Sequence, residues 1–248
     1  MEPVDTLKTE TASAEPTNLA PYSLTHMTDR SILLIESTHT TQQTDAIDMS
    51  TTKTAPKQET RTALLEVGLE IMQQKGYSNT GIQEILNALG VPKGSFYHYF
   101  DSKETYAIEI IHHYDQHYSA ALLRMMRNPK ETPIQRLRSY CEDGKAKLAA
   151  KECRHGCFIG SLSQEMSDQS ERLRQELSQV VRKWRDMVSA CIAEGQELGE
   201  IKKSWTPDAA AELFLSGWSG AVMRTKTVKD TEPLEVFIKL MFEDVLKP

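Results

Sequence analysis

The chain has 248 residues, of which 39% are hydrophobic, so it can bury the core of one large domain or of two small ones. Its formal net charge is −6 at pH 7, and an acidic balance argues by itself against a nucleic-acid partner. No apolar run approaches the roughly 18 residues of a membrane span, and no basic start precedes an apolar core as in a secretory signal. The four cysteines, at 141, 153, 157 and 191, lack zinc-finger spacing, so we expect reduced thiols in a cytoplasmic protein without a bound metal or cofactor.

Residues 1–56 are rich in Thr, Ser, Pro and Gln and show little hydrophobic periodicity. Such a segment cannot bury enough apolar surface to offset the entropy lost on ordering, so we predict a disordered tail. Met49 opens a stretch that looks like an ordinary translation start, and Met27 is another candidate. We therefore hypothesise that the tail is a misassigned start, which mass spectrometry of the native N-terminus would test.

The stretch 76–103 reads as two short helices joined by a tight turn. The first opens at Thr80 or Gly81 and repeats apolar residues at helical spacing. Thr80 is its predicted N-cap, and Gln83 would complete a capping box. Gly90 ends this helix, because glycine adopts the left-handed conformation of a C-terminal cap without strain.

A helix is predicted over residues 59–75, directly before this pair. The second helix of the pair begins after Pro92 and runs over 93–99. Phe96 and Phe100 are four residues apart and are predicted to face inward. The outward face would present Lys93, Gly94, Ser95, Tyr97 and His98.

A polar, aromatic and basic face on a short helix is typical of a helix-turn-helix, whose second helix lies in the major groove. Lys93 and Lys103 would meet phosphates, and Gly94 would let the backbone approach closely. The predicted DNA-binding residues are Thr80, Gly81, Lys93, Gly94, Ser95, Tyr97, His98 and Lys103. The alternative is a packed helical hairpin with a solvated face. Net charge does not favour either, since residues 57–104 hold five Lys or Arg against six Asp or Glu.

Residues 58–104 resemble the DNA-binding domain of the TetR family of transcriptional repressors. The matching features are Gly76-Tyr77, Thr80, the run GVPKGSFYHYF at 90–100 and SKE at 102–104. The resemblance implies a three-helix helix-turn-helix DNA-binding domain over 57–104 and a helical ligand-binding and dimerisation domain over 105–248. It also implies a homodimer that places two recognition helices about 34–36 Å apart on double-stranded operator DNA.

The remainder of the chain shows helical periodicity and no β pattern, so we predict an all-α fold. The predicted helices cover 101–127, 133–150, 157–166, 170–198, 208–225 and 232–246. The helix over 101–127 would cross both domains and couple them as a lever. His113 and His117 have the spacing of a metal pair, but no third ligand is evident, so we interpret them as surface histidines.

The last two predicted helices carry more apolar and small residues than one monomer needs. Gly217 and Gly220 would allow close approach of another helix. In TetR-like proteins these helices pair with those of a second subunit, so the resemblance implies dimerisation here. The alternative is that both faces pack only within the chain.

Two further segments, 156–166 and 217–226, resemble one branch of the TetR family. This branch contains acrylate-responsive regulators and the repressor of N-ethylmaleimide reductase, and its inducers are reactive or unsaturated carbonyl compounds. With these segments the resemblance covers nearly all of residues 58–245. It implies a small-molecule inducer of the same chemical class.

Two sensing mechanisms stay open. In the first, Cys157 is a sensing thiol with Lys226 as its partner, because a thiolate near a helix N-terminus and a lysine has a lowered pKa. In the second, Arg224 binds a carboxylate beside an apolar wall. The predicted wall residues are Phe158, Met166 and Trp218. The plain structural interpretation is that Cys157 is a small core residue.

The leading functional interpretation is a ligand-responsive repressor. A thiol enzyme is the rival class, with Cys157, His155 and Glu165 as nucleophile, base and orienting group. However, His155 lies two residues from Cys157 and would point elsewhere on a helix, and the sequence has no phosphate-binding loop or dinucleotide motif. A helical interaction module without DNA binding is a third class, against which the intact run at 92–100 argues.

Overall fold

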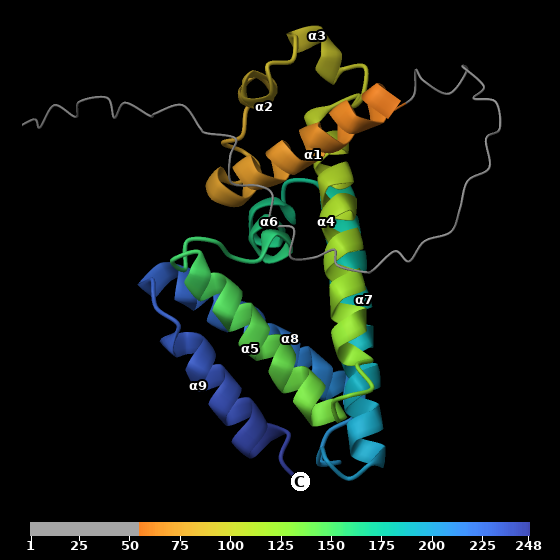
Figure 1. Ribbon diagram of the computed structural model, residues 1–248, viewed down its shortest axis with the longest axis vertical. Coiled ribbons are helices and arrows are strands. Elements are labelled where there is room, and N and C mark those ends of the chain that lie inside the picture. The colour runs from red at the N-terminus through yellow and green to blue at the C-terminus, as the bar shows by residue number, and fades with distance from the viewer. Residues whose placement is uncertain (1–54) are drawn as a thin grey trace, which may run out of the picture. The chain divides into compact units, whose positions relative to one another are not determined.

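The computed structural model describes the backbone from residue 55 and the side chains from residue 58 onward, and every regular element in that range is helical (Figure 1). The elements are α1 (Ala55–Lys75), α2 (Ile82–Leu89), α3 (Lys93–Phe96), α4 (Lys103–Met126), α5 (Pro133–Ala150), α6 (Phe158–Met166), α7 (Glu171–Glu197), α8 (Pro207–Val228), α9 (Glu232–Leu240) and the π-helical turn η3 (Met241–Val245). The predicted all-α class is confirmed. In the described range no helix is long and apolar enough to cross a membrane.

Several helix boundaries differ from the prediction, and two of these differences concern the DNA-binding end. Helix α1 begins at Ala55, so the predicted tail over 1–56 otherwise lies outside the described residues. Helix α3 ends at Phe96, three residues before its predicted end. The reason is that Tyr99 donates its N–H to the carbonyl of Phe96 over 2.9 Å, a three-residue bond that closes a tighter turn than an α-helix.

The predicted cap of α2 is wrong. The N-cap is Gly81, with extended backbone angles of φ −90° and ψ 140° and no side-chain cap bond. Thr80 is instead 1% exposed, and its hydroxyl donates to the carbonyl of Gly76 over 2.6 Å. Gln83 donates to Asn87 over 2.8 Å, so the capping box is absent as well. The tertiary burial of Thr80 outweighs its local preference for a cap.

The C-terminal end of α2 agrees with the prediction. Gly90 is left-handed, with φ 63° and ψ 27°. Its N–H donates to the carbonyl of Asn87, and the N–H of Val91 donates to the carbonyl of Leu86 over 3.0 Å. Glycine is favoured here because a side chain would strain the left-handed backbone.

An aromatic core holds α3 against α1 and α4. Phe96, Phe100 and Tyr106 are at most 2% exposed, and their ring centroids lie 4.7–5.4 Å apart. The Tyr106 hydroxyl donates to the carbonyl of Leu64 on α1. A side chain at Gly68 would meet the Tyr106 hydroxyl at 1.8 Å, so glycine allows this close approach. The predicted inward direction of Phe96 and Phe100 is confirmed.

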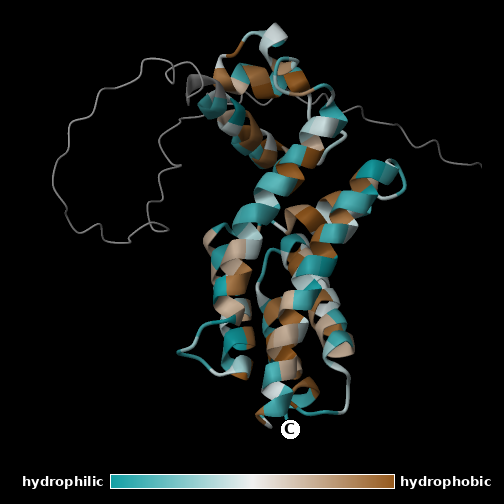
Figure 2. Cartoon of the chain, turned by 90° about the vertical axis from the view of Figure 1, so that its right-hand side faces the viewer, coloured by the Kyte–Doolittle hydropathy of each residue, from teal (hydrophilic) through white to brown (hydrophobic). Residues whose placement is uncertain are grey.

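The C-terminal helices form a bundle around α7, which packs against α4, α5, α6 and α8. Apolar residues gather on the facing sides of these helices (Figure 2). The N-cap of α7 is Ser170, whose hydroxyl accepts the N–H of Leu173 over 3.2 Å. Helix α4 runs from the α1–α3 region into this bundle, as predicted (Figure 1).

Gly217 has an internal role. A side chain there would lie 2.7 Å from the Phe237 ring of α9, so the glycine lets α8 and α9 pack closely within one chain. Gly220, in contrast, has no described heavy atom within 4 Å of its notional side chain. The predicted close approach of another helix at Gly217 is therefore satisfied inside the chain, whereas Gly220 stays open.

Candidate functional site

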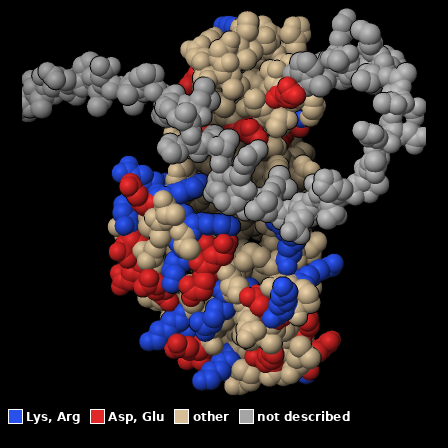
Figure 3. All heavy atoms as spheres, in the orientation of Figure 1, with Lys and Arg blue, Asp and Glu red and all other residues tan. Residues whose placement is uncertain are grey.

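The outer face of α3 and the N-cap of α2 form what we call the recognition surface, defined as Gly81, Lys93, Gly94, Ser95, Tyr97 and His98. All of these are exposed except Ser95, which is half-buried. The Tyr97 side chain is 57% exposed, while its ring packs edge-on against Phe96 with 5.4 Å between centroids. Most of the visible surface over α2 and α3 is neither acidic nor basic (Figure 3).

Within the described residues, Lys93 makes no hydrogen bond or ion pair, which leaves its ammonium group free for a phosphate. Tyr97 offers an exposed hydroxyl on a ring that Phe96 holds in place. The recognition surface therefore combines free donors with a rigid apolar base. Such a surface can position itself on a nucleic-acid backbone and reach base edges.

Two of the predicted DNA-binding residues, Lys103 and Thr80, are not part of the recognition surface. The Lys103 ammonium group donates to the carbonyl of Tyr77 over 2.6 Å and lies 4.3 Å from the Tyr77 ring centroid. Burial lowers the pKa of Lys103, against the opposing effect of the Glu165 carboxylate. Thr80 is buried, as described above. Both polar groups have internal partners, so a direct DNA contact from either one stays a prediction that the geometry does not favour.

Cys157 is the N-cap of α6 and is half-buried, whereas the other three cysteines are buried. Its sulfur accepts the N–H of Gly160 over 3.4 Å and shares a hydrogen bond with the Tyr114 hydroxyl. Burial raises the pKa of the Cys157 thiol, and the N–H groups of Gly160 and Ile159 and the Tyr114 hydroxyl offset only part of this effect. The predicted lowering of the Cys157 pKa is therefore wrong.

Lys226 was the predicted partner of that thiol. Its aliphatic stem instead packs beside Gly156, where a side chain on the glycine would lie 3.5 Å from the lysine Cδ. Lys226 is not among the groups that shift the Cys157 pKa. The partner that the structure supplies is Tyr114 on α4.

Tyr114 belongs to what we call the aromatic cluster, defined as Tyr114, Tyr118, Tyr140, Phe158 and Trp184. Tyr114 stacks on Tyr118 with 5.7 Å between centroids, and Tyr118 lies 4.2 Å from Trp184. The hydroxyl oxygens of Tyr118 and Tyr140 are 2.5 Å apart. Burial raises the pKa of all three tyrosines, which keeps them neutral. The four-residue spacing of Tyr114 and Tyr118 on α4 was the signal available in the sequence.

The predicted carboxylate pocket is assembled only in part. The ring centroid of Phe158 lies 5.5 Å from that of Tyr114 within the aromatic cluster. The ring centroid of Trp218 lies 5.5 Å from that of Tyr140, so Trp218 borders the cluster. Met166, at the other end of α6, is 6% exposed. Arg224 is exposed and makes no hydrogen bond or ion pair with any described residue. The structure therefore does not bring Arg224 to the aromatic wall.

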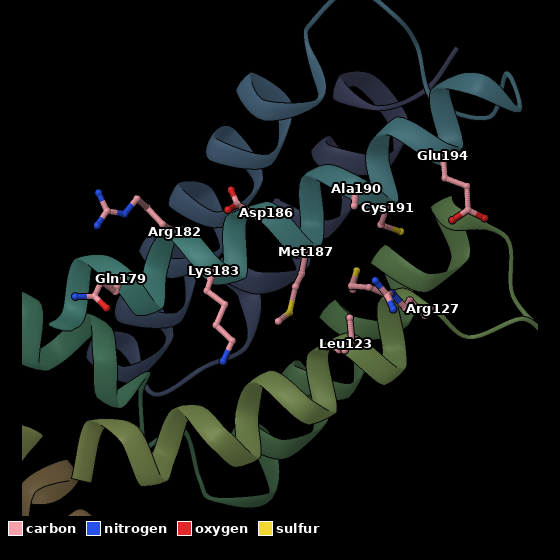
Figure 4. Close-up of a pocket in the computed structure, with 11 residues that line it drawn as sticks. Leu123, Arg127, Gln179, Arg182, Lys183, Asp186, Met187, Ala190, Cys191 and Glu194 are labelled. Atoms are coloured by element: carbon pink, nitrogen blue, oxygen red, sulfur yellow. The ribbon is translucent and has the colours of Figure 1, made fainter. Parts of the chain in front are cut away.

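A groove with a volume of about 650 Å³ lies between α4 and α7 (Figure 4). Its apolar lining includes Leu123 and Met187, and the Met187 side chain points toward α4. Cationic residues border it, and one of them, Lys183, pairs with Asp115 over 2.7 Å. None of the predicted sensing residues lines this groove.

Glu165, which the sequence suggested only as the orienting group of a thiol enzyme, is the lone charged residue of α6 and has a different partner. Its carboxylate accepts the backbone N–H of Tyr77 over 2.8 Å and that of Ser78 over 2.7 Å. Helix α6 thus joins the thiol of Cys157 at one end to the turn between α1 and α2 at the other. No local sequence pattern shows this contact, because its partners are 87 and 88 residues apart in the chain.

A helix-turn-helix with free donors, attached to a helical bundle, defines a DNA-binding transcriptional regulator. The model of the bacterial regulatory proteins of the tetR family matches residues 64–110, and that of the tetracyclin repressor-like C-terminal domain matches 133–241. The chain belongs to the TetR family. It is thus related to DNA-binding transcriptional regulators, as the sequence predicted.

Individual proteins support this assignment. The transcriptional regulator AcuR of Cereibacter sphaeroides is 36% identical over 177 residues, which cover 71% of this chain and 81% of AcuR. The repressor DhaR of a Mycobacterium species is 33% identical over 186 residues, which cover 75% of this chain and 92% of DhaR. The crystal structure of the reduced form of NemR from Escherichia coli superposes with a TM-score of 0.70 at 28% identity, over 76% of this chain and 98% of NemR.

Proposed function

We propose that the protein is a homodimeric repressor that leaves its operator when a small unsaturated carbonyl or electrophilic compound reaches Cys157. The observation that carries the proposal is the position of α6. Its N-cap residue Cys157 is the least buried of the four cysteines, and its last turn is bonded to the helix-turn-helix region. A change at one end of this short helix can therefore reach the DNA-binding end.

Operator binding is proposed to involve the recognition surface. Lys93 would neutralise a phosphate, and Tyr97 and His98 would donate to phosphates or to base edges. We leave Thr80 and Lys103 out of this contact set, because their polar groups have internal partners. Because the net charge of the chain is negative, the chain as a whole does not attract DNA. The affinity for DNA therefore has to come from the free donors of the recognition surface.

Dimerisation is proposed through α8 and α9. Large apolar side chains are 44–51% exposed at five positions on these two adjacent helices. They are Leu213, Met223, Val228, Val236 and Leu240. The open position at Gly220 lies on the same helix as three of them and would accept a close neighbour. A second copy of the chain would cover this face, as in the family to which the chain belongs.

The covalent mechanism is the better supported of the two. In this step the Cys157 sulfur forms a bond to the β-carbon of the conjugated alkene, and the alkene electron pair moves toward the carbonyl group. A proton from water, equal to the one that the thiol released, then completes the α-carbon. The adduct would enlarge a side chain that borders the aromatic cluster, and a packed interior responds to added volume by shifting its elements. For the carboxylate mechanism, the structure does not bring the exposed Arg224 together with the predicted apolar wall.

The test is a gel shift with the full chain on DNA upstream of its own gene, without additive, with N-ethylmaleimide and with acrylate. We expect a shift that N-ethylmaleimide releases, and we expect Cys157→Ser to shift equally but to resist release. Release of Cys157→Ser by N-ethylmaleimide would eliminate the covalent mechanism. Release by acrylate that Arg224→Ala abolishes would favour the non-covalent mechanism. Failure to shift any DNA, including a randomised library, would contradict the proposed repressor.

A further inference from the structure

The turn between α1 and α2, residues 76–81, is bonded to α6 by a carboxylate. Glu165 accepts two consecutive backbone N–H groups through its two oxygens, from Tyr77 over 2.8 Å and from Ser78 over 2.7 Å. Gly76 has φ +81°, and a side chain there would lie 2.7 Å from a Glu165 oxygen. The carboxylate thus occupies the space beside a left-handed residue, and glycine is required both for the backbone angle and for the contact.

Tyr77 is held from a second side by α4. Lys103 donates to its carbonyl oxygen over 2.6 Å and lies above its ring. The N–H of Tyr77 is therefore bonded to α6, while its carbonyl and ring are bonded to α4. The charges of Glu165 and Lys103 also favour each other, since the carboxylate raises the pKa of the lysine against the effect of burial. A single loop residue thereby fixes three elements relative to one another.

A second carboxylate, on α4, accepts hydrogen bonds from residues that follow Glu165 in the chain. Glu104, in the first turn of α4, accepts the Ser170 hydroxyl over 2.6 Å and the Arg172 guanidinium over 2.8 Å. Ser170 is also the N-cap of α7. The segment 165–172 is therefore bonded to the helix-turn-helix region at both of its ends. Two bonded points restrain rotation, which a single point does not.

Glu165 is ionised in this arrangement. Burial opposes its charge, but the Ser78 and Tyr77 donors and the Lys103 charge outweigh burial, so the pKa of Glu165 is lowered. A carboxylate that accepts two N–H groups forms stronger bonds than a neutral acceptor. Helix α6 has nine residues, from Phe158 to Met166, and a helix of this length spans about 14 Å as one rigid unit.

We propose that Glu165 is a positioning residue for operator binding, because it sets the angle of α1–α3 on the C-terminal bundle and with it the separation of the two recognition surfaces in the dimer. This inference rests on the proposed DNA-binding function. Glu165 would thereby determine which half-site spacing the dimer fits. A change of one base pair in that spacing moves a half-site by about 3.4 Å along the DNA and rotates it about the DNA axis.

The first measurement is hydrogen exchange of the Tyr77 and Ser78 amides in the full chain without DNA. We expect Glu165→Gln and Glu165→Ala to speed exchange at these two amides by about tenfold, the scale of a lost charge-assisted bond. The matched control is Glu171→Gln, because its partners in the described part of the chain, Arg174 and Gln175, lie on its own helix. Unchanged exchange in both Glu165 variants would overturn the proposal whatever the DNA result.

The second measurement compares two affinities. One is for an operator selected by the wild type from a randomised library, and the other is for the same operator with one base pair inserted between its half-sites. We expect Glu165→Gln to bind the selected site about tenfold more weakly than the wild type, and to lose much less affinity on the inserted site than the wild type does. A purely structural role would weaken both sites equally and leave the ratio of affinities unchanged, which would overturn the positioning role. If the wild type binds no DNA, the proposed function fails, whereas the exchange measurement still decides the contact.

Should the alanine variant fold poorly, as a lowered midpoint in thermal denaturation would reveal, the glutamine variant decides. Glutamine has almost the same volume and keeps one acceptor oxygen, so it removes the charge and one bond with little loss of packing. Glu165→Asp adds a second check, because its shorter side chain keeps the charge but cannot reach both amides equally. We expect its affinity ratio to lie between those of the wild type and Glu165→Gln.

Discussion

The recognition surface and the aromatic cluster treat polar groups in opposite ways. On the recognition surface, Lys93 has no partner among the described residues, and Tyr97 is 57% exposed. In the aromatic cluster, the tyrosine hydroxyls are buried, and Tyr114 and Tyr118 bond to Cys157 and Tyr140. The first region keeps its donors free for a partner outside the molecule. The second has satisfied its donors internally, so a ligand has to displace or add to a packed structure.

This difference concerns rigidity as well as bonding. The recognition surface lies on the buried rings of Phe96, Phe100 and Tyr106, which support it without facing DNA. Around Cys157, in contrast, the residues next to the reactive atom are themselves the core. A change at Cys157 therefore alters packing directly, whereas a change on the recognition surface leaves packing intact. The predictions below test this contrast.

The largest effect is expected beneath the recognition surface. Phe96→Ala should lower the free energy of unfolding by about 3–5 kcal/mol, because it leaves a cavity among rings that lie about 5 Å apart. Urea denaturation followed by circular dichroism measures this loss, and DNA binding should disappear with it. A loss below about 1 kcal/mol would contradict the idea that these rings form the base of the surface.

A smaller and more selective effect is expected on the recognition surface itself. Tyr97→Ala should weaken operator binding by about 1–3 kcal/mol while the free energy of unfolding stays within about 0.5 kcal/mol. Lys93→Ala should weaken binding to all sequences and reduce the slope of log affinity against log salt by about one. Fluorescence anisotropy titrations at several salt concentrations measure both quantities.

Lys147→Ala is the control for this experiment. Lys147 is exposed on α5, and its one ion pair within the described range is with Asp143, one turn away on the same helix. Its removal should leave both affinity and salt slope unchanged. If Tyr97→Ala also binds normally, the outer face of α3 is not the surface that contacts the operator.

How much the sequence could predict follows the same contrast. Gly90, Phe96 and Phe100 were predicted correctly because a cap and an inward pair depend on neighbours within four residues. Thr80 was predicted wrongly at the α2 cap, because its hydroxyl has a competing acceptor in Gly76 once the turn is buried. Local rules describe local partners, and they fail where burial supplies a different one.

The sensing region depends on contacts that are distant in sequence. The rule that a helix N-terminus and a nearby lysine lower a thiol pKa omitted burial, which at Cys157 acts in the opposite direction and is larger. Tyr114 reaches Cys157 from α4, and Glu165 reaches Tyr77 across 88 residues. Only the fold shows these pairs, because their members are far apart in the chain.

A third prediction isolates the Tyr114 hydroxyl. Tyr114→Phe should slow alkylation of Cys157 by N-ethylmaleimide about two- to fivefold near pH 8, because the lost hydrogen bond no longer stabilises the thiolate. The pKa of Cys157 should rise further, so the pH–rate profile should move to higher pH. Tyr118→Phe is the matched control, since its hydroxyl pairs with Tyr140. Equal rates in Tyr114→Phe and the wild type would show that the hydroxyl has no influence on the thiol.

A further small effect is a loss of stability in alkali that comes from the buried thiols. Burial raises the pKa of Cys191 from 9.0 to about 11, and its thiol donates to the carbonyl of Pro133. Between these two pH values the folded state keeps a proton that the unfolded state releases. The contribution of this thiol to the free energy of unfolding is therefore fully present below about pH 9 and falls as the pH rises toward 11. At pH 10 this one thiol should cost roughly 1 kcal/mol. Urea denaturation at pH 7.5 and pH 10 measures the difference, and Cys191→Ala should show a smaller one, because alanine has no proton to keep. An equal loss in that variant would assign the alkaline effect to other groups, such as the buried tyrosines of the aromatic cluster.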